Sequence, residues 1–311
     1  MLPHADDFLL DLQANNYSPE TVYNYERDLS VFDNFLEESG IDFDKADKRT
    51  IPYYKAYLVS RDRKTASLGQ SDKQLDSRSI NRMLSALRGY MRYLVDMDYP
   101  CPIPPQAVKL TKVGRKHPQV AELNDLVRLI EAPRSLESNA KIALRNQAML
   151  EVLFATGMRI SELCNLNRNQ IDDSGRIFIT GKGRKQRFVY LTPRAKEYLE
   201  AYLNTRKDNC PALFIPYAGR NVVSPRRRIS TNYLQERIKR YREKLKINVP
   251  TSAHSLRHGF ATYLAEEGAN PAALQILLGH ESLDTTTRYV HASDKYAEET
   301  HHKYHPLSQP R

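Results

Sequence analysis

The chain has 311 residues, more than a single hydrophobic core comfortably organises, so two domains are expected. Hydrophobic residues make up 41% of it and charged residues 27%, which is ordinary for a soluble globular protein. The net charge of +10 favours an anionic partner, with nucleic acid as the first candidate, although a merely soluble basic protein would carry the same charge.

Several classes of protein are excluded by what the sequence lacks. No apolar run approaches the roughly 18 residues that span a bilayer, and the start MLPHADDFLL is not a secretion signal. The cysteines, Cys101, Cys164 and Cys210, are far apart and form no CxxC pattern of a metal or disulfide site. We therefore expect a cytoplasmic protein with no membrane partner, no metal and no cofactor.

The first domain is predicted to be helical. Ser18 and Pro19 are typical of a helix start, Gly40 is typical of a helix end, and apolar residues recur between them at steps of three and four. The same spacing predicts a shorter helix near residues 8–12 and further helices at 51–59 and 79–96. Residues 61–75 are polar and aperiodic, which predicts a loop.

A proline-rich segment separates this part from the second domain. Residues 99–119 contain Pro100, Pro102, Pro104, Pro105 and Pro118, which preclude a helix and favour extended chain. The predicted division is a helical domain at 1–105, a basic linker at 106–118 and a second domain at 119–311.

The second domain is predicted to be mostly helical around one small sheet. Residues 176–191 read RIFITGKGRKQRFVYL, two β-rich arms around a glycine-containing turn, which indicates an antiparallel hairpin. Gly157 ends one helix and Arg159 begins the next. The fold class is mainly α, and the helices are expected at 123–130, 140–155, 193–203, 231–245, 255–267, 271–278, 285–290 and, in the tail, 293–302.

Basic residues gather where they would suit DNA phosphates. Residues 220–246 carry ten Lys and Arg against two Glu, whereas residues 1–50 carry twelve Asp and Glu against four Lys and Arg. The predicted helix at 79–96 also carries several arginines, which solvated surface positions would explain as well as phosphate contacts would. The candidate DNA contacts are Arg78, Arg82, Arg88, Arg92, Arg184, Lys185, Arg226, Arg227, Arg228, Arg237, Lys239 and Arg240.

Common catalytic motifs do not fit. GKG at 181–183 lacks the spacing and the Ser or Thr of a phosphate-binding loop, and it lacks the third glycine of a dinucleotide fingerprint. HSLRH at 254–258 has Ser255 where a zinc-protease helix has Glu. No Ser occupies a GxSxG elbow.

What remains is a set of cations and one phenol. Breaking a phosphodiester without metal requires a nucleophile, positive charge around the phosphorus and an acid for the leaving oxygen. Tyr suits a nucleophile whose product stays attached, Arg holds phosphate oxygens bidentately, Lys can donate a proton, and His titrates near neutral pH. Each residue alone also has an ordinary structural explanation, such as an ion pair between Arg159 and Glu162 one turn apart.

Together, these residues resemble a known family. Arg159, Lys182, His254, Arg257, His280 and Tyr289 follow the order and spacing of the tyrosine recombinases, the phage-integrase family. The strings that carry the resemblance are ATGMRISEL (155–163), GKGRKQR (181–187), HSLRHGFATYLAEEG (254–268) and LLGHESLDTTTRYVH (277–291). YSPETVYNYERDLSVF and INRMLSALRGYMRYL look like the family's helical, SAM-like core-binding domain, and the tail HHKYHP is most similar to the Xer type.

The resemblance implies a mechanism. Tyr289 would attack the scissile phosphate to form a 3′-phosphotyrosyl link, Lys182 would protonate the 5′ oxygen, and His254 would accept the tyrosine proton. Arg159, Arg257 and His280 would bind the phosphate, and Glu162 would support the site by orienting a neighbouring basic group.

The resemblance also implies partners. Four protomers, identical or of two kinds, would recombine two specific duplex DNA sites through a Holliday junction, in Xer-like resolution, integration or excision. The tail at 293–302 would dock on a neighbouring protomer, or it would pack on its own domain. A DNA translocase and accessory factors are candidate partners. The alternatives are a type IB topoisomerase that relaxes supercoils and a non-catalytic DNA-binding protein on the same fold.

Overall fold

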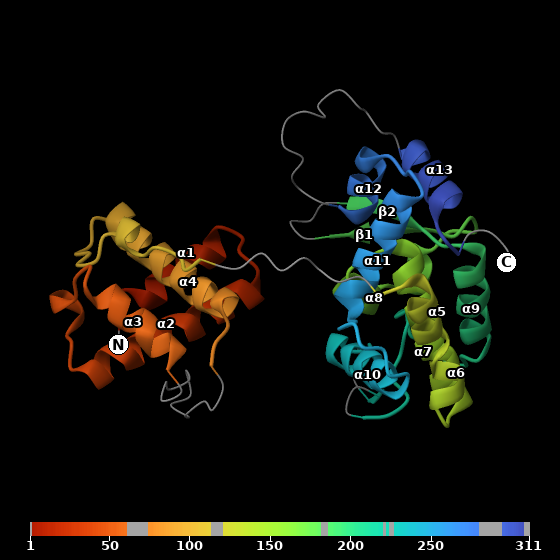
Figure 1. The fold of residues 1–311 in the computed structure, drawn as a ribbon, viewed down its shortest axis with the longest axis horizontal. Helices are drawn as coiled ribbons and strands as arrows, with labels where there is room; N and C mark the ends of the chain where they lie inside the picture. Colours follow the sequence, from red (N-terminus) through yellow and green to blue (C-terminus); the bar gives the residue numbers. More distant parts are fainter. Residues whose placement is uncertain are drawn as a thin grey trace. The chain divides into compact units, whose positions relative to one another are not determined.

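The computed structural model describes residues 2–60, 74–112, 121–181, 186–219, 222–223, 227–279 and 294–307. The chain divides into two compact units, Met1–Lys116 and His117–Arg311 (Figure 1). Several predicted features lie outside the described residues: most of the 61–75 loop, the 285–290 helix, and Lys182, Arg184, Lys185, Arg226, His280 and Tyr289. None of the described helices is long and apolar enough to cross a membrane.

The first unit is a helical bundle. The Ser18 hydroxyl caps a helix by accepting the Thr21 amide at 3.1 Å, and Gly40 ends that helix with a φ of 62°. The last helix begins at Ser77, two residues earlier than the apolar pattern predicts, because the Asp76 carboxylate accepts the Ser79 amide at 2.7 Å. The helices are α1 (Ala5–Ala14), α2 (Pro19–Ser39), α3 (Thr50–Val59) and α4 (Ser77–Asp96), with a 3-10 turn η1 (Phe43–Lys45).

Part of the proline-rich segment folds onto the first unit. A 3-10 turn, η2 (Pro105–Ala107), is followed by Val108, which is 1% exposed. The amide and hydroxyl of Thr111 donate to the Asn81 side-chain oxygen at 2.7 and 2.8 Å. The first residues of the predicted 106–118 linker are therefore fixed against α4, because apolar side chains between the prolines have a core to enter.

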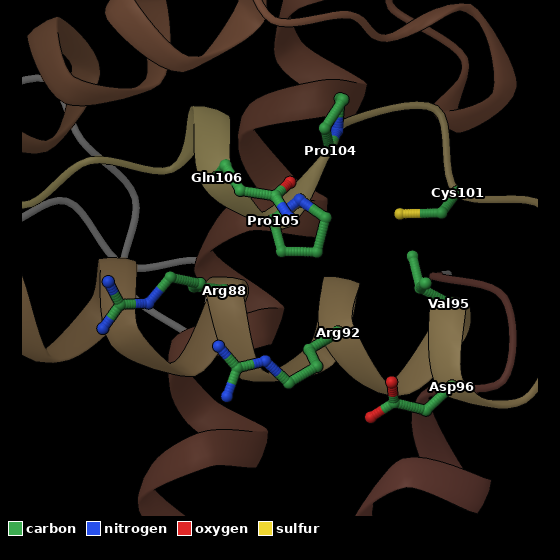
Figure 2. Close-up of a pocket in the computed structure, with 8 residues that line it drawn as sticks. All are labelled: Arg88, Arg92, Val95, Asp96, Cys101, Pro104, Pro105 and Gln106. Atoms are coloured by element: carbon green, nitrogen blue, oxygen red, sulfur yellow. The ribbon is translucent and has the colours of Figure 1, made fainter.

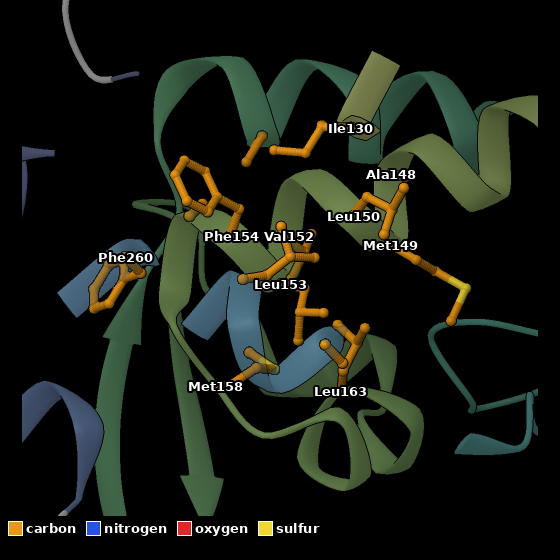
Figure 3. Packing of buried hydrophobic residues seen from close by; sticks show 14 of the residues in the cluster. Ile130, Ala148, Met149, Leu150, Val152, Leu153, Phe154, Met158, Leu163 and Phe260 are labelled. Atoms are coloured by element: carbon orange, nitrogen blue, oxygen red, sulfur yellow. The ribbon is translucent and has the colours of Figure 1, made fainter. Parts of the chain in front are cut away.

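The second unit is built around α7 (Ala140–Thr156), whose side chains are buried on almost every face (Figure 3). Its neighbours include α5 (Leu123–Glu131), α6 (Pro133–Leu136), α9 (Pro193–Asn204) and α11 (Ala253–Glu266). Helix α6 was not predicted from the sequence, because four residues are too few for helical periodicity to show. The remaining elements are α8 (Ile160–Asn165), η3 (Arg168–Gln170), α10 (Thr231–Lys244), α12 (Pro271–Leu278) and α13 (Asp294–Tyr304).

The predicted hairpin forms the sheet of the second unit. Strands β1 (Arg176–Thr180) and β2 (Gln186–Tyr190) pair antiparallel, with Ile177 opposite Val189 and Thr180 opposite Gln186. Ile177 and Val189 are fully buried. The hairpin therefore fixes Thr180 and Gln186, which lie on either side of residues 181–185, to the core of the unit.

Helix α13 packs on its own unit, against α11, α12 and β2. His301 is fully buried, and its Nε2 donates to the Ala155 carbonyl at 2.5 Å. His305 is 2% exposed and lies next to the Phe154 ring. Burial lowers the pKa of His301 to about 4, so this histidine is neutral in the folded protein at neutral pH.

Candidate active site

Arg159 is positioned by the turn between α7 and α8. Gly157 ends α7 with a φ of 60°, a conformation that glycine adopts without strain. Arg159 then caps α8: its backbone amide donates to Glu162 Oε2 at 2.7 Å and its guanidinium donates to Oε1 at 2.9 Å. The ion pair considered as the ordinary explanation of Arg159 is present. The side chain nevertheless stays 35% exposed, so it can also meet a ligand.

His254 and Arg257 come from the first turns of α11. Ser252 caps this helix by accepting the Ser255 amide at 3.2 Å. His254 and Arg257 lie one helical turn apart. His254 is exposed, whereas Arg257 is buried, with 6% of its surface exposed. Arg257 donates to the Gly157 carbonyl at 2.7 Å, which ties α11 to the turn before Arg159.

Three arginines from three different elements converge on the end of α12. Arg187 of β2 donates through Nε to the Leu277 carbonyl at 2.9 Å. Arg257 donates to the next carbonyl, Leu278, at 2.5 Å, and Arg159 reaches the Gly279 carbonyl at 3.5 Å. The last carbonyls of a helix lack partners within it and attract cations. The end of α12 therefore gathers positive charge at the residue that directly precedes His280.

The clustered charge changes the acid–base properties of the site. Burial, with Arg159 and Arg187 nearby, lowers the pKa of Arg257 to about 10, so this residue stays protonated at neutral pH. Although His254 is exposed, partial desolvation of its ring lowers its pKa, and His258, Arg257 and Arg159 lower it further. The His254 ring is thus neutral near pH 7 and able to accept a proton. Such a concentration of cations suits an anion.

Glu162 lies within this cluster. Burial alone would raise its pKa, but hydrogen bonds from Arg187 and Arg159 outweigh burial and lower the pKa below its usual value. Arg187 contacts both carboxylate oxygens, at 2.8 and 3.0 Å. The basic group that Glu162 holds through both carboxylate oxygens is Arg187.

Arg187 is the residue of this cluster that was not singled out from the sequence. A signal for it exists, because strand alternation places position 187 on the same face as the buried Val189. An arginine at an inward position of a strand must be paired. Lys182, His280 and Tyr289 lie outside the described residues. Gly181, which precedes Lys182, and Gly279, which precedes His280, flank the arginine cluster.

Several of the candidate DNA-contacting residues have protein partners within their own unit. Arg82 pairs with Asp28 at 2.5 Å and Arg237 with Glu137 at 3.2 Å. Lys239 lies 4.0 Å from Glu243, and Arg228 donates to the Leu166 carbonyl at 2.9 Å. These contacts give Arg82, Arg228 and Arg237 structural roles.

Arg88 and Arg92 are arranged differently from Arg82. They line a pocket of about 520 Å³ beside Pro104 and Pro105, with both guanidinium groups on the same side of α4 (Figure 2). This arrangement leaves them suited to contact phosphate.

Among the described residues, no group of His, Cys, Asp and Glu is arranged to hold a metal ion.

Comparisons with known proteins cover nearly the whole chain. The model described as "Phage integrase family" matches residues 119–296, and "Phage integrase, N-terminal SAM-like domain" matches residues 5–97. The tyrosine recombinase XerD of Staphylococcus epidermidis is 31% identical over 93% of both chains. The tyrosine recombinase XerC of Lactobacillus delbrueckii subsp. bulgaricus is 31% identical over 94% of both.

Solved structures show the same fold. The site-specific recombinase XerH bound to palindromic difH in a post-cleavage complex is 21% identical, with a TM-score of 0.69 over 93% of this chain and 81% of that one. A lambda integrase tetramer bound to a Holliday junction is 16% identical, with a TM-score of 0.64 over 93% and 79%.

Proposed function

Because the chain belongs to the phage integrase family and is a Xer-like, site-specific tyrosine recombinase, we propose that it cleaves and rejoins duplex DNA through a covalent link to Tyr289. The observation that carries the proposal is the convergence of Arg159 and Arg257 on the end of α12, directly before His280. This convergence would let two guanidinium groups bind one phosphate.

The phosphate would be held by Arg159, Arg257 and His280. A guanidinium has five N–H donors, and Arg257 donates to two backbone carbonyls, so donors remain for the non-bridging oxygens. These cations would stabilise the charge that develops as phosphorus becomes five-coordinate. Arg257 is held rigidly, whereas the more exposed Arg159 can adjust to the DNA.

Tyr289 would attack the phosphate and form a 3′-phosphotyrosyl link, while Lys182 gives a proton to the departing 5′ oxygen. The neutral ring of His254 would accept the tyrosine proton and return it when a DNA hydroxyl reverses the step. The phosphodiester energy is conserved in the link, so rejoining requires no ATP and no metal. Glu162 would act indirectly, through its hold on Arg159 and Arg187.

Recombination would take place in a tetramer of identical or paired protomers on two DNA sites, with strands exchanged through a Holliday junction. A lambda integrase tetramer bound to a Holliday junction is one of the similar solved structures. We propose that α13 is exchanged between protomers. Because α13 packs on its own unit through buried His301, and His305 is buried just after it, exchange requires this helix to leave its site and take the same site on a neighbour. A DNA translocase or accessory factors would act on this assembly.

A nicked suicide duplex tests the proposal. Genomic fragments bound by the protein are first recovered and sequenced to obtain the target site. A nick next to the scissile phosphate then lets the cleaved strand diffuse away, so the covalent adduct accumulates. We expect an adduct that Tyr289→Phe abolishes while DNA binding is retained. An adduct that survives Tyr289→Phe would refute the role of Tyr289.

The alternatives give other outcomes. Rapid relaxation of a supercoiled plasmid that lacks the site would favour a type IB topoisomerase. Specific binding with no adduct on any suicide duplex would favour a non-catalytic DNA-binding protein. The comparisons with XerC and XerD support neither alternative.

A further inference from the structure

The Arg187–Glu162 ion pair lies where β2, α8 and α12 meet. Arg187 is 7% exposed and Glu162 6% exposed at their side chains. The guanidinium contacts both carboxylate oxygens, at 2.8 and 3.0 Å, and its Nε donates to the Leu277 carbonyl at 2.9 Å. One planar side chain thus fixes the relative positions of three elements.

Two glycines pack directly against this pair. A Cβ added at Gly181 would lie 3.0 Å from an Arg187 terminal nitrogen and 3.2 Å from Glu162 Oε1. A Cβ added at Gly279 would lie 3.0 Å from both Cδ and Nη1 of Arg187. All of these distances are shorter than ordinary van der Waals contacts, so only a residue without a side chain fits at either position. The backbone at Gly181 and at Gly279 therefore lies directly against the guanidinium of Arg187.

The next residue after each glycine has a proposed catalytic role: Lys182 follows Gly181, and His280 follows Gly279. The two glycines belong to segments far apart in the chain, the hairpin and the end of α12. The guanidinium of Arg187 is the common surface on which both backbones rest.

We propose that Arg187 is a positioning residue, which holds the backbone at Gly181 and Gly279 and thereby places Lys182 and His280 at the scissile phosphate. This inference rests on the proposed function, because the roles of Lys182 and His280 are assigned there. Arg187 itself does not touch the substrate.

The chemistry of the pair explains why Arg is required. Lysine would bring the same charge but only one nitrogen, so it cannot contact both oxygens of Glu162 and the Leu277 carbonyl at once. Methionine would fill similar space and leave Glu162 with Arg159 as its cation. In both variants the two glycine backbones lose their common surface.

The decisive experiment measures single-turnover formation of the covalent adduct on the suicide duplex. A displacement of about 1 Å at a reacting group can cost about 100-fold in rate. We therefore expect Arg187→Met to lower the cleavage rate by about 100-fold and Arg187→Lys to lower it by at least tenfold, with DNA affinity unchanged. Arg176→Met is the matched control, because Arg176 lies on the same hairpin, is 45% exposed and pairs with Asp172.

A second substrate separates positioning from folding. If the 5′ bridging oxygen is replaced by sulfur, the leaving thiolate needs no proton from Lys182. We expect this substrate to restore the part of the rate that Arg187→Met loses through Lys182, because a misplaced acid is no longer needed, and to leave the part lost through His280. A loss of the same size on both substrates would refute the proposal, since damage to the fold would slow both alike.

Gly181→Ala provides an independent check should Arg187→Met fold poorly. The added Cβ should lower the cleavage rate in the wild-type background and cause a smaller further loss in Arg187→Lys, where the Arg187 nitrogen is gone and Glu162 Oε1 is the tight contact that remains. Additive losses would overturn the inference. Tyr289→Phe, run in parallel, separates this result from failure of the proposed function: if its adduct persists, the proposed function is wrong, whatever Arg187 does.

Discussion

Gly157→Ala tests whether the turn after α7 is built around a single ring. Gly157 has a φ of 60°, and an added Cβ would lie 2.4 Å from Phe260 Cδ1, inside van der Waals contact. Phe260 is fully buried on α11, the helix that also carries His254 and Arg257. The substitution thus strains the backbone and pushes a ring in the helix that carries a proposed phosphate ligand, Arg257, and the proposed base, His254.

The magnitude follows from these two effects. A left-handed conformation costs a residue with a Cβ about 1–2 kcal/mol, and overpacking a core costs about 1–3 kcal/mol. We therefore expect Gly157→Ala to destabilise the second unit by about 2–5 kcal/mol. Gly40→Ala is a matched control, because Gly40 ends α2 with a φ of 62° and its Cβ would meet nothing within 4 Å. It should cost its own unit only about 1–2 kcal/mol.

Hydrogen–deuterium exchange followed by mass spectrometry measures the unfolding free energy of each unit separately, through peptides that belong to that unit alone. Slowly exchanging peptides of α7 report on Gly157→Ala and those of α2 on Gly40→Ala. Phe260→Leu, added to Gly157→Ala, should recover part of the loss because the smaller side chain can withdraw. Equal losses for the two glycine variants would refute the steric part of the reasoning. Strictly additive losses in the double variant would refute it as well.

Three further predictions concern charge. Arg82→Met leaves the buried Asp28 carboxylate unpaired, so at pH 7 it should cost about 1–3 kcal/mol of unfolding free energy. Burial raises the pKa of Asp28 to about 6 despite Arg82, so the folded state binds the Asp28 proton more tightly than the unfolded state does. At pH 5 the carboxyl is largely neutral, and the loss of unfolding free energy in Arg82→Met should be smaller than at pH 7. Equal losses in urea titrations at both pH values would contradict this. Arg88→Met should weaken DNA binding for all sequences and reduce the salt slope by about 0.9, whereas Arg237→Met, which breaks a pair with Glu137, should leave the slope unchanged in binding titrations. The pKa of His254 is lowered, and its protonated form cannot accept a proton, so kcat/KM for cleavage should stay constant down to pH 6.5 and reach half its maximum only below that pH. His258→Gln removes one cause of the lowered pKa and should move this half-maximal pH upward. A half-maximal pH above 6.5 in the wild type would count against His254 as the base.

Much of the fold follows from local sequence signals. Ser18 and Gly40 bound a helix because a hydroxyl cap and a left-handed glycine satisfy its end groups, and both are visible in the sequence. The start of α4 was missed by two residues, because Asp76 caps the helix before its apolar stripe begins. The packing of α13 was left open, since a helix with one buried face fits its own unit and an identical neighbour equally well.

The candidate site was predictable to a different degree. Arg159 and Arg257 were singled out by family resemblance, whereas their local sequence allowed an ordinary structural role for each. Their meeting at successive carbonyls of α12 depends on tertiary packing, which no local pattern encodes. Arg187 could have been found from strand alternation, but its partner Glu162 could not, because the two belong to different elements.

The two carbonyl contacts of Arg257 have a consequence for the entropy of DNA binding. A free arginine side chain has about 2 kcal/mol of rotamer entropy to lose when it is immobilised. Hydrogen bonds to Gly157 and Leu278 immobilise Arg257 when the chain folds, before any DNA arrives. In its proposed role, Arg257 would offer a phosphate a guanidinium plane that is already oriented, so almost none of this entropy would be lost at the moment of binding.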